Sequence, residues 1–469
     1  MYYRLNDAYR LRGWEKLPYA LVKRPENNVI FLNREEFEAA SLCNGYMDTE
    51  SVFVTARQKE IMDALAEKGI AEPCPLGRGL KPEQEYHQYP SRYIRTAHWS
   101  VTGRCNYRCR HCFMSAPNAK FGELSHETCM ELIDQMAGCG VQCVTLTGGE
   151  PLVRKDFMDL VDRLLEKEIR ILTIYSNGRL VTDQLLDALE ERGIYPKFDM
   201  SFDGVGHHDW LRGIDGAEEE VVAAFRRCRD RGFATGSELC LHQGNKDTLR
   251  ESVRLLADLG VENLKVNPVA GTELWERYDR DYSLTMDELF EIYLDYIPHY
   301  FEDNMPLQLM LGGFFMGFKG NTNYRIPSIK YTAPTEKCLK SAVCGHARNV
   351  LYLSAEGRML PCMSLSSMNI QNRYPLATEI GLAKGLSDSS YMSLIDTRLS
   401  EFLEHNEECR ACEYKMQCGG GCRASALSTG DDILGPDRST CKILREGYVP
   451  RIEAAVKEGM ALRQNTETW

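Results

Sequence analysis

The sequence predicts an α/β protein whose centre is an open, partial barrel of six strand–helix units. Between residues 97 and 305, short apolar segments alternate with amphipathic segments of helical period. Residues 1–80 instead show short strands followed by helices, and beyond residue 305 the alternation stops and cysteines accumulate. Six units are too few for a closed eight-stranded barrel, so we expect a partial (β/α)6 TIM-like barrel flanked by two smaller domains.

The domain boundaries are predicted where the pattern changes. The predicted parts are a small domain at 1–80, a polar, proline-bearing linker at 81–96, the barrel at 97–305, a glycine-rich connector at 306–337, a cysteine-rich domain at 338–445 and a C-terminal helix at 446–469. Because the cysteine-rich part lacks long apolar elements, we expect metals to replace much of its hydrophobic core.

The small domain begins with three predicted strands, at 8–14, 19–24 and 28–34, followed by helices at 35–45 and 55–70. Apolar runs in the barrel predict parallel strands with helices between them. The barrel strands are expected at 98–103, 143–149, 170–178, 197–204, 235–242 and 262–270, and their helices at 126–140, 155–168, 182–193, 217–232, 246–260 and 285–297.

Composition excludes several functional classes. The net charge of −12 argues against a nucleic-acid-binding surface. No apolar run reaches the length of a membrane helix and no secretory signal is visible, so we expect a cytoplasmic protein with no membrane partner. Eighteen cysteines in 469 residues are far fewer than in a disulfide scaffold, which leaves metal ligation, catalysis or burial. Seven scattered cysteines are expected to be buried apolar residues: Cys43, Cys74, Cys129, Cys139, Cys143, Cys228 and Cys240.

The remaining cysteines form two groups. Cys105, Cys109 and Cys112 follow the first barrel strand with C-x3-C-x2-C spacing, one ligand short of a tetrahedral site. Either a structural zinc takes a distant fourth ligand, or one metal position stays open at the carboxyl face of the sheet, where chemistry is expected. The second group is Cys338, Cys344, Cys362, Cys409, Cys412, Cys418, Cys422 and Cys441. Eight thiols make two complete sets of four, and spacing alone does not separate zinc ribbons from iron–sulfur clusters.

The first group resembles the radical S-adenosylmethionine enzymes. The motif TGGEP one unit later (Gly148, Gly149, Glu150 and Pro151) strengthens this resemblance. It implies that Cys105, Cys109 and Cys112 hold a [4Fe–4S] cluster whose open iron binds S-adenosylmethionine, the source of a 5′-deoxyadenosyl radical. Further contacts to S-adenosylmethionine are implied for polar residues at the same face: His111, Ser176, Asn177, Ser201 and Asp203. We expect His207 and His208 to be solvated.

The second group, together with Gly357, resembles the SPASM extension of these enzymes. The resemblance implies two auxiliary [4Fe–4S] clusters, and therefore three clusters in all. One auxiliary cluster would be held by Cys338, Cys344, Cys362 and Cys422, and the other by Cys409, Cys412, Cys418 and Cys441. Fully ligated clusters are suited to electron transfer, so an electron donor such as flavodoxin or ferredoxin is an expected partner.

The substrate is expected to be a peptide. In sulfatase-maturating relatives an aspartate follows the third auxiliary cysteine, whereas this chain has Met363, which argues against that activity. The N-terminal pattern resembles the winged-helix element that binds leader peptides, where an extended leader can add a strand to a sheet edge. The alternative is a packing or dimerisation domain.

The leading hypothesis is a maturase that removes a hydrogen from a ribosomally made precursor peptide and installs a thioether or carbon–carbon cross-link. The proton acceptor is left open among Asp203, Glu238 and Cys240. The alternatives are oxidation of a protein Cys or Ser, and a non-catalytic iron–sulfur carrier.

Overall fold

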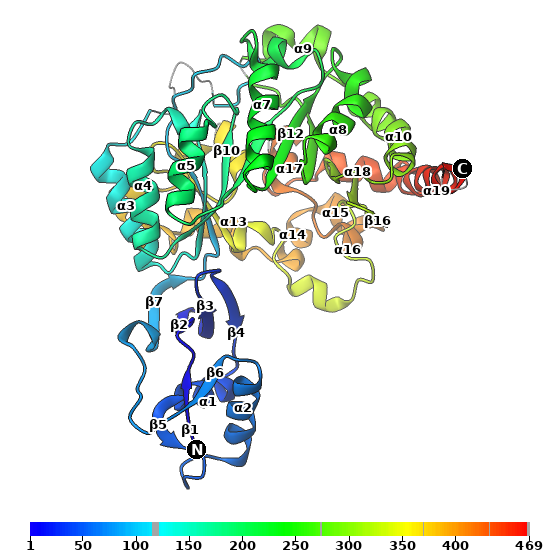
Figure 1. Ribbon diagram of the computed structural model, residues 1–469. Helices are drawn as coiled ribbons and strands as arrows, with labels where there is room; N and C mark the ends of the chain where they lie inside the picture. Colours follow the sequence, from blue (N-terminus) through cyan, green and yellow to red (C-terminus); the bar gives the residue numbers. More distant parts are fainter. Residues whose placement is uncertain (115–121, 273, 369, 431, 467–469) are drawn as a thin grey trace.

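The computed structural model describes residues 1–114, 122–272, 274–368, 370–430 and 432–466 of the chain. A small N-terminal unit stands at one end of a larger α/β body, and C-terminal helices pack beside that body (Figure 1). No helix in the described part of the chain is long and apolar enough to cross a membrane.

The N-terminal unit contains two small sheets, ordered β5-β1-β6 and β4-β3-β2-β7. Leu11 and Leu21 of the second sheet pack with α1 and α2, whereas Trp14 and Val22 belong to a separate cluster on its other side. The elements are β1 (Tyr2–Leu5), β2 (Tyr9–Glu15), β3 (Leu17–Lys23), β4 (Asn28–Phe31), α1 (Arg34–Leu42), β5 (Asn44–Asp48), α2 (Ala56–Glu67), β6 (Ala71–Cys74), η1 (Pro82–Gln84) and β7 (His87–Arg92).

The three strands and two helices expected before residue 80 are present as β2, β3, β4, α1 and α2. Asn33 and Thr55 cap the two helices with capping boxes, the signal that marks their starts in sequence. The stretch expected to be a linker instead contains β7, which pairs in parallel with β2. Because β7 belongs to the same sheet, this stretch is tied to the N-terminal unit over part of its length.

The central sheet has the order β16-β15-β14-β13-β12-β11-β10-β9-β8-β17-β18. The strands from β8 to β14 run parallel to their neighbours, so the predicted partial barrel is confirmed. The six expected strands are β8 (Thr96–Ser100), β9 (Cys143–Thr147), β10 (Arg170–Ser176), β11 (Lys197–Ser201), β12 (Thr235–Leu241) and β13 (Asn263–Pro268).

Helices cover the outer face of this sheet (Figure 1). Apolar residues of the helices and strands form one large core, because most of the helices have an apolar stripe, whereas α9 buries none of its residues. The helices of this body are α3 (His126–Gly138), α4 (Phe157–Glu166), α5 (Asp183–Glu191), α6 (His208–Arg212), α7 (Ala217–Asp230), α8 (Leu249–Asp258), α9 (Glu276–Tyr282) and α10 (Met286–Glu302), with the short η2 (Pro151–Val153) and η3 (Lys246–Thr248).

Both edges of the sheet are extended. The expected connector contains β14 (Gln308–Leu311), which is parallel to β13, and then β15 (Phe315–Phe318) and β16 (Asn321–Arg325), which each run antiparallel to the preceding strand. On the other edge β17 (Val350–Leu353) pairs in parallel with β8, and β18 (Met359–Leu360) follows it. The C-terminal elements are η4 (Glu336–Lys340), η5 (His346–Arg348), η6 (Met363–Ser367), η7 (Gln371–Arg373), α11 (Ala377–Ile380), α12 (Leu382–Gly385), α13 (Ser389–Asp396), α14 (Leu399–His405), α15 (Glu407–Ala411), α16 (Lys415–Cys418), α17 (Arg423–Gly430), α18 (Arg438–Arg445) and α19 (Tyr448–Thr466).

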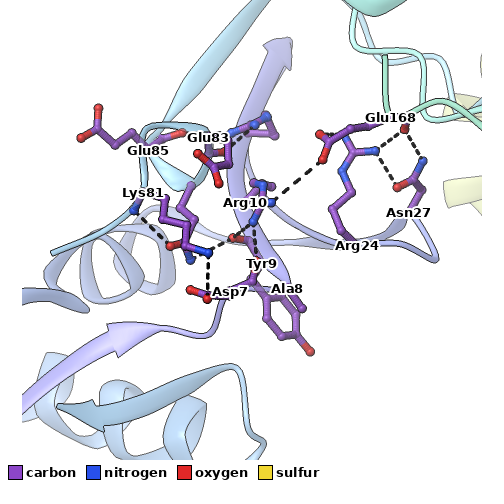
Figure 2. A network of polar contacts seen from close by, with 12 residues as sticks. Asp7, Ala8, Tyr9, Arg10, Arg24, Asn27, Lys81, Glu83, Glu85 and Glu168 are labelled. Atoms are coloured by element: carbon purple, nitrogen blue, oxygen red, sulfur yellow. Dashed lines mark hydrogen bonds and ion pairs between the residues drawn. The ribbon is translucent and has the colours of Figure 1, made fainter. Parts of the chain in front are cut away.

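A polar seam joins the N-terminal unit to the barrel (Figure 2). The guanidinium of Arg24 donates to the carbonyl of Glu168 and lies 3.5 Å from its carboxylate. Asn27 donates to the same carbonyl at 3.0 Å, and the indole N–H of Trp14 donates to the carbonyl of Cys139 at 3.2 Å. Glu168 and Cys139 precede β10 and β9, so the unit contacts the amino ends of the barrel strands.

Candidate active site and metal centres

The three cysteines of the first group lie in the loop that follows β8, at the carboxyl end of the sheet. Burial raises the pKa of the Cys105 thiol to about 12, and the nearby Cys109 and Cys112 add to this shift. The three sulfurs therefore lie close enough to interact. Thiolates crowded in this way need a cation or a metal, because each one disfavours ionisation of the others.

The TGGEP segment holds this loop by backbone contacts. The N–H of Gly149 donates to the carbonyl of Thr102, and the N–H of Glu150 donates to that of Arg104, both at 2.8 Å. A Cβ on Gly148 would lie 2.6 Å from the Thr102 oxygen, and one on Gly149 would lie 2.3 Å from the Arg104 oxygen. Both glycines are thus required for the approach of two backbone segments, a reason that the motif alone did not reveal.

Glu150, Ser176 and Asn177 come together beside the loop. The Glu150 carboxylate is fully buried and accepts the backbone N–H of Asn177 at 2.7 Å and the Ser176 hydroxyl at 3.1 Å. Burial raises the pKa of Glu150 to about 7, although these hydrogen bonds oppose the rise. The Asn177 amide donates to the side-chain oxygen of Asn106, inside the cysteine loop, at 2.7 Å. Glu150 therefore links the second and third strands to that loop.

Asp203 lies at the centre of a buried polar cluster that sequence reasoning did not foresee. Its carboxylate accepts the Nε–H of Arg212 at 2.6 Å and the backbone N–H of Cys240 at 3.0 Å. Burial alone would raise the pKa of Asp203, but Arg212 and His208 hold it well below its usual range. His208 is fully buried and accepts the Asp203 N–H, so the expectation that it is solvated is wrong.

Arg212 was missed because α6 is only five residues long, too short to show helical periodicity. The signal available in the sequence was the run HHDWLRG, which begins at His207, shortly after β11 ends at Ser201. The ion pair with Arg212 makes Asp203 a poor proton acceptor, and its burial removes it from direct contact with a bound molecule.

His111 lies against this cluster. Ligand atoms of His111, Asp203 and Cys240 lie within 4.8 Å of one another. Burial, with the nearby Arg212, lowers the pKa of His111 to about 3, so its imidazole is neutral. Burial also raises the pKa of Cys240 far above its usual range, which makes it a thiol rather than a base.

Ser201 and Glu238 lie side by side where β11 pairs with β12. The Glu238 side chain is one-third exposed, and its carboxylate lies 3.4 Å from the Lys265 ammonium. Glu238 differs from the other two candidate proton acceptors, Asp203 and Cys240. Its carboxylate is partly exposed and is not fully occupied by hydrogen bonds. It shares a face of β12 with Cys240, two residues later.

Seven of the eight C-terminal cysteines lie near one another in two groups. Cys409, Cys412, Cys418 and Cys441 together line one pocket. In the other set, burial raises the pKa of Cys362, with further contributions from Cys422 and Cys344. Cys338 lies in η4, six residues before Cys344.

Three consecutive glycines separate Cys418 from Cys422. Gly419, Gly420 and Gly421 all have positive φ, at 56°, 92° and 67°. Cβ atoms there would lie within 2.8 Å of neighbouring side chains. The run CGGGC thus turns the chain sharply between Cys418 and Cys422. Thiolate-only sets with buried walls fit iron–sulfur clusters as well as zinc.

Comparisons with known proteins agree with this architecture. Residues 99–256 match the family model of the radical SAM superfamily. Pre-heme d1 synthase of Dinoroseobacter shibae is 26% identical over 369 residues, which make up 74% of this chain and 88% of that protein. The mycofactocin maturase MftC of Mycobacterium tuberculosis is 26% identical over 383 residues, covering 77% and 88% of the two chains.

Among solved structures, Streptococcus suis SuiB bound to the precursor peptide SuiA superposes with a TM-score of 0.66. The two chains are 15% identical, and the match covers 94% of this chain and all of SuiB. At that identity the likeness shows the fold. A match of this extent includes most of the N-terminal unit.

Proposed function

We propose that this chain is a maturase that installs a cross-link in a ribosomally made precursor peptide, because residues 99–256 match the radical SAM superfamily. The observation that carries the proposal is the loop of three clustered thiols at the carboxyl end of β8, in a chain that also has an N-terminal unit with an open sheet edge.

Cys105, Cys109 and Cys112 would hold a [4Fe–4S] cluster, and the fit rests on their grouping and on the donor set. When bound, the cluster and S-adenosylmethionine supply a carbon-centred radical able to remove a hydrogen atom from an unactivated carbon. Glu150, Ser176 and Asn177 would fix the rim of this site, because they tie the loop to β9 and β10. The neutral ring of His111 would provide an apolar surface beside the loop.

Glu238 is the proton acceptor that we propose for the step in which the cross-linked product loses a proton. Asp203 is bonded to Arg212 and enclosed, and the thiol of Cys240 is a weak base. The Glu238 carboxylate is one-third exposed and lies 3.4 Å from the Lys265 ammonium, so it is accessible from the carboxyl end of the sheet.

The precursor peptide would bind at β4. This strand is the outer strand of the sheet β4-β3-β2-β7, so one row of its backbone groups has no strand partner. Ile30 and Phe31 on it are 40% and 50% exposed and point to opposite faces of the sheet, so an added strand with apolar side chains could contact an apolar residue on either face. Binding there would raise the local concentration of the segment to be modified.

The two C-terminal cysteine sets would hold auxiliary clusters, which would take up the electron left when the cross-linked product loses its proton. Flavodoxin or ferredoxin would be the external electron donor to the first cysteine set. The grouping of Cys409, Cys412, Cys418 and Cys441 around one pocket supports the second of these sites.

A second candidate is chemistry on a tetrapyrrole. Pre-heme d1 synthase and MftC are equally similar to this chain, at 26% identity. Only a peptide substrate would use the N-terminal unit, so the role of this unit distinguishes the two candidate functions.

The test is anaerobic reconstitution of the full chain. We expect roughly twelve irons per chain, four for each cluster, and formation of 5′-deoxyadenosine with S-adenosylmethionine and a reductant. Co-expression with a short cysteine- or aromatic-bearing peptide from a neighbouring reading frame is expected to lower its mass by about two daltons per cross-link. Tightly bound zinc, or turnover of a porphyrin but of no peptide, would contradict the proposal.

The role of β4 is tested by I30D/F31D, with V52D/F53D as the matched control, since Val52 and Phe53 are exposed apolar residues of the same unit. We expect the first pair to weaken peptide binding at least about tenfold, which corresponds to about 1.4 kcal/mol. Equal weakening by both pairs would remove the strand-addition model.

A further inference from the structure

The short helix α6 packs against the backbone of the cysteine loop. The N–H of Arg110, between Cys109 and Cys112, donates to the carbonyl of Leu211 at 2.9 Å. Gly213 ends the helix with φ of 66°, and a Cβ there would lie 2.5 Å from the Arg108 carbonyl oxygen. Backbone-to-backbone contact therefore sets the position of α6 relative to the loop.

This backbone contact places the Arg212 side chain beside the sulfur of Cys109. Arg212 is 8% exposed, and its Nη1 donates to the sulfur of Cys109 at 3.7 Å. Its Nε–H donates to Asp203 at 2.6 Å, so one guanidinium bridges a buried carboxylate and a thiol. Asp203 is itself held by the backbone N–H of Cys240.

We infer that Arg212, held by Asp203, is a positioning residue for the cluster of the first cysteine set and raises the reduction potential of that cluster. The inference rests on the proposed assignment of a [4Fe–4S] cluster to Cys105, Cys109 and Cys112. It assigns to α6 a role in setting how readily the cluster accepts an electron.

The direction of the effect follows from charge. Reduction adds one negative charge to a cluster whose sulfurs carry much of the electron density. A hydrogen bond and a cation at a ligand sulfur stabilise the reduced form more than the oxidised form, which raises the potential. Because Arg212 and Asp203 are both buried, solvent screens this interaction weakly.

The experiment is a potentiometric titration of the anaerobically reconstituted full chain, followed by electron paramagnetic resonance. The signal of this cluster is the one that disappears in the triple variant C105A/C109A/C112A. Two variants remove the contact with sulfur: R212M, and D203N/R212M, which leaves no unpaired buried charge if the single variant folds poorly. R212K keeps the positive charge but replaces the planar guanidinium group with an ammonium group.

At the potential that half-reduces the wild-type cluster, we expect the ratio of reduced to oxidised cluster to fall about tenfold in D203N/R212M, and at least as far in R212M, where the Asp203 carboxylate is left unpaired. That change is about 59 mV for a one-electron couple. R212K should recover part of it. The matched control is R179M, because Arg179 is a partly exposed cation that pairs with Glu220, the acceptor of the Tyr107 hydroxyl from the same loop.

An unchanged midpoint in D203N/R212M, or an equal shift in R179M, overturns the inference and leaves the proposed function intact. Selective loss of about four irons per chain from the first site in D203N/R212M supports it, since the contact then retains the cluster. If the triple cysteine variant loses no signal, the cluster assignment fails and the inference fails with it.

Discussion

At the scale of single residues, Glu150 shows how burial makes stability depend on pH. Its ordinary pKa of 4.5 rises to about 7 in the folded protein. Between these values the folded state keeps a proton that the unfolded state has lost, so stability falls as pH rises and levels off above about 7. Glutamine keeps a hydrogen-bond acceptor and does not ionise.

We therefore expect E150Q to remove part of the pH dependence of unfolding. For the metal-free protein, wild type should lose about 1 kcal/mol more than E150Q between pH 6 and pH 8, since one pKa unit is about 1.4 kcal/mol. Denaturant midpoints at the two pH values measure this difference. E219Q on the exposed face of α7 is the control, and identical profiles for E150Q and wild type would contradict the expectation.

Gly149 provides a second prediction at this scale. In G149A the new Cβ would lie 2.3 Å from the Arg104 carbonyl oxygen, a backbone atom that moves only if the cysteine loop moves. We expect the reconstituted variant to lose about four irons per chain, because the three thiols no longer converge. G138A is the control: a Cβ there meets nothing within 4 Å, and alanine favours the helix by about 1 kcal/mol. Full iron content in G149A would refute this expectation.

At the scale of elements, the sequence predicts what periodicity and caps encode. All six barrel strands are present where apolar runs lie between amphipathic helices. Strands such as β1 and β6, four residues each, are too short to show a pattern and depend on partners distant in the sequence. The extension of the sheet by β17 could not be predicted for the same reason, since its partner β8 lies about 250 residues earlier.

The residues of the candidate site likewise fall into those that local sequence signals reveal and those that they do not. Cys105, Cys109 and Cys112 were visible because cysteine spacing in one loop is local information. The contact of Arg212 with Cys109 joins residues 103 positions apart, and no local signal encodes it. The sequence indicated that Gly148 and Gly149 allow a close approach of the backbone. It did not indicate which segment approaches, because a glycine carries no information about its contact partner.

The packing of α19 on α10 gives a prediction in which two effects compete. Gly459 of α19 is buried, and a Cβ there would lie 2.8 Å from backbone atoms of Pro298. Alanine would favour the helix by about 1 kcal/mol, whereas overpacking against backbone costs about 1–3 kcal/mol. We expect G459A to lower the thermal midpoint, and E458A on the exposed side to change it little. A more stable G459A would show that the two helices can separate without cost.

At the scale of the whole molecule, the seam places the N-terminal unit at the amino ends of the barrel strands, whereas the cysteine loop lies at their carboxyl ends. A peptide held at β4 would therefore have to pass along the barrel to reach that loop. Strands of five to seven residues span roughly 17–23 Å. An extended chain needs about five to seven residues to cover that distance, so the unit must be held firmly for the spacing to be defined.

Gly140 tests whether the seam holds the unit. It has φ of 69°, and a Cβ would lie 2.4 Å from the Tyr89 ring and 2.5 Å from the Trp14 indole nitrogen, both on the N-terminal unit. We expect G140A to push the seam apart and to speed proteolysis between residues 75 and 95.

The matched control is G193A. Gly193 also follows a helix with φ of 66°, but a Cβ there meets nothing within 4 Å. Both variants carry the same backbone strain of about 1–2 kcal/mol, so faster cleavage in G140A alone isolates the contact across the seam. Equal cleavage of the two would mean that strain, and not the seam, governs attachment. If the proposed peptide binds at β4, G140A should bind it normally yet modify it more slowly, because the bound segment is no longer held at a fixed distance from the cysteine loop.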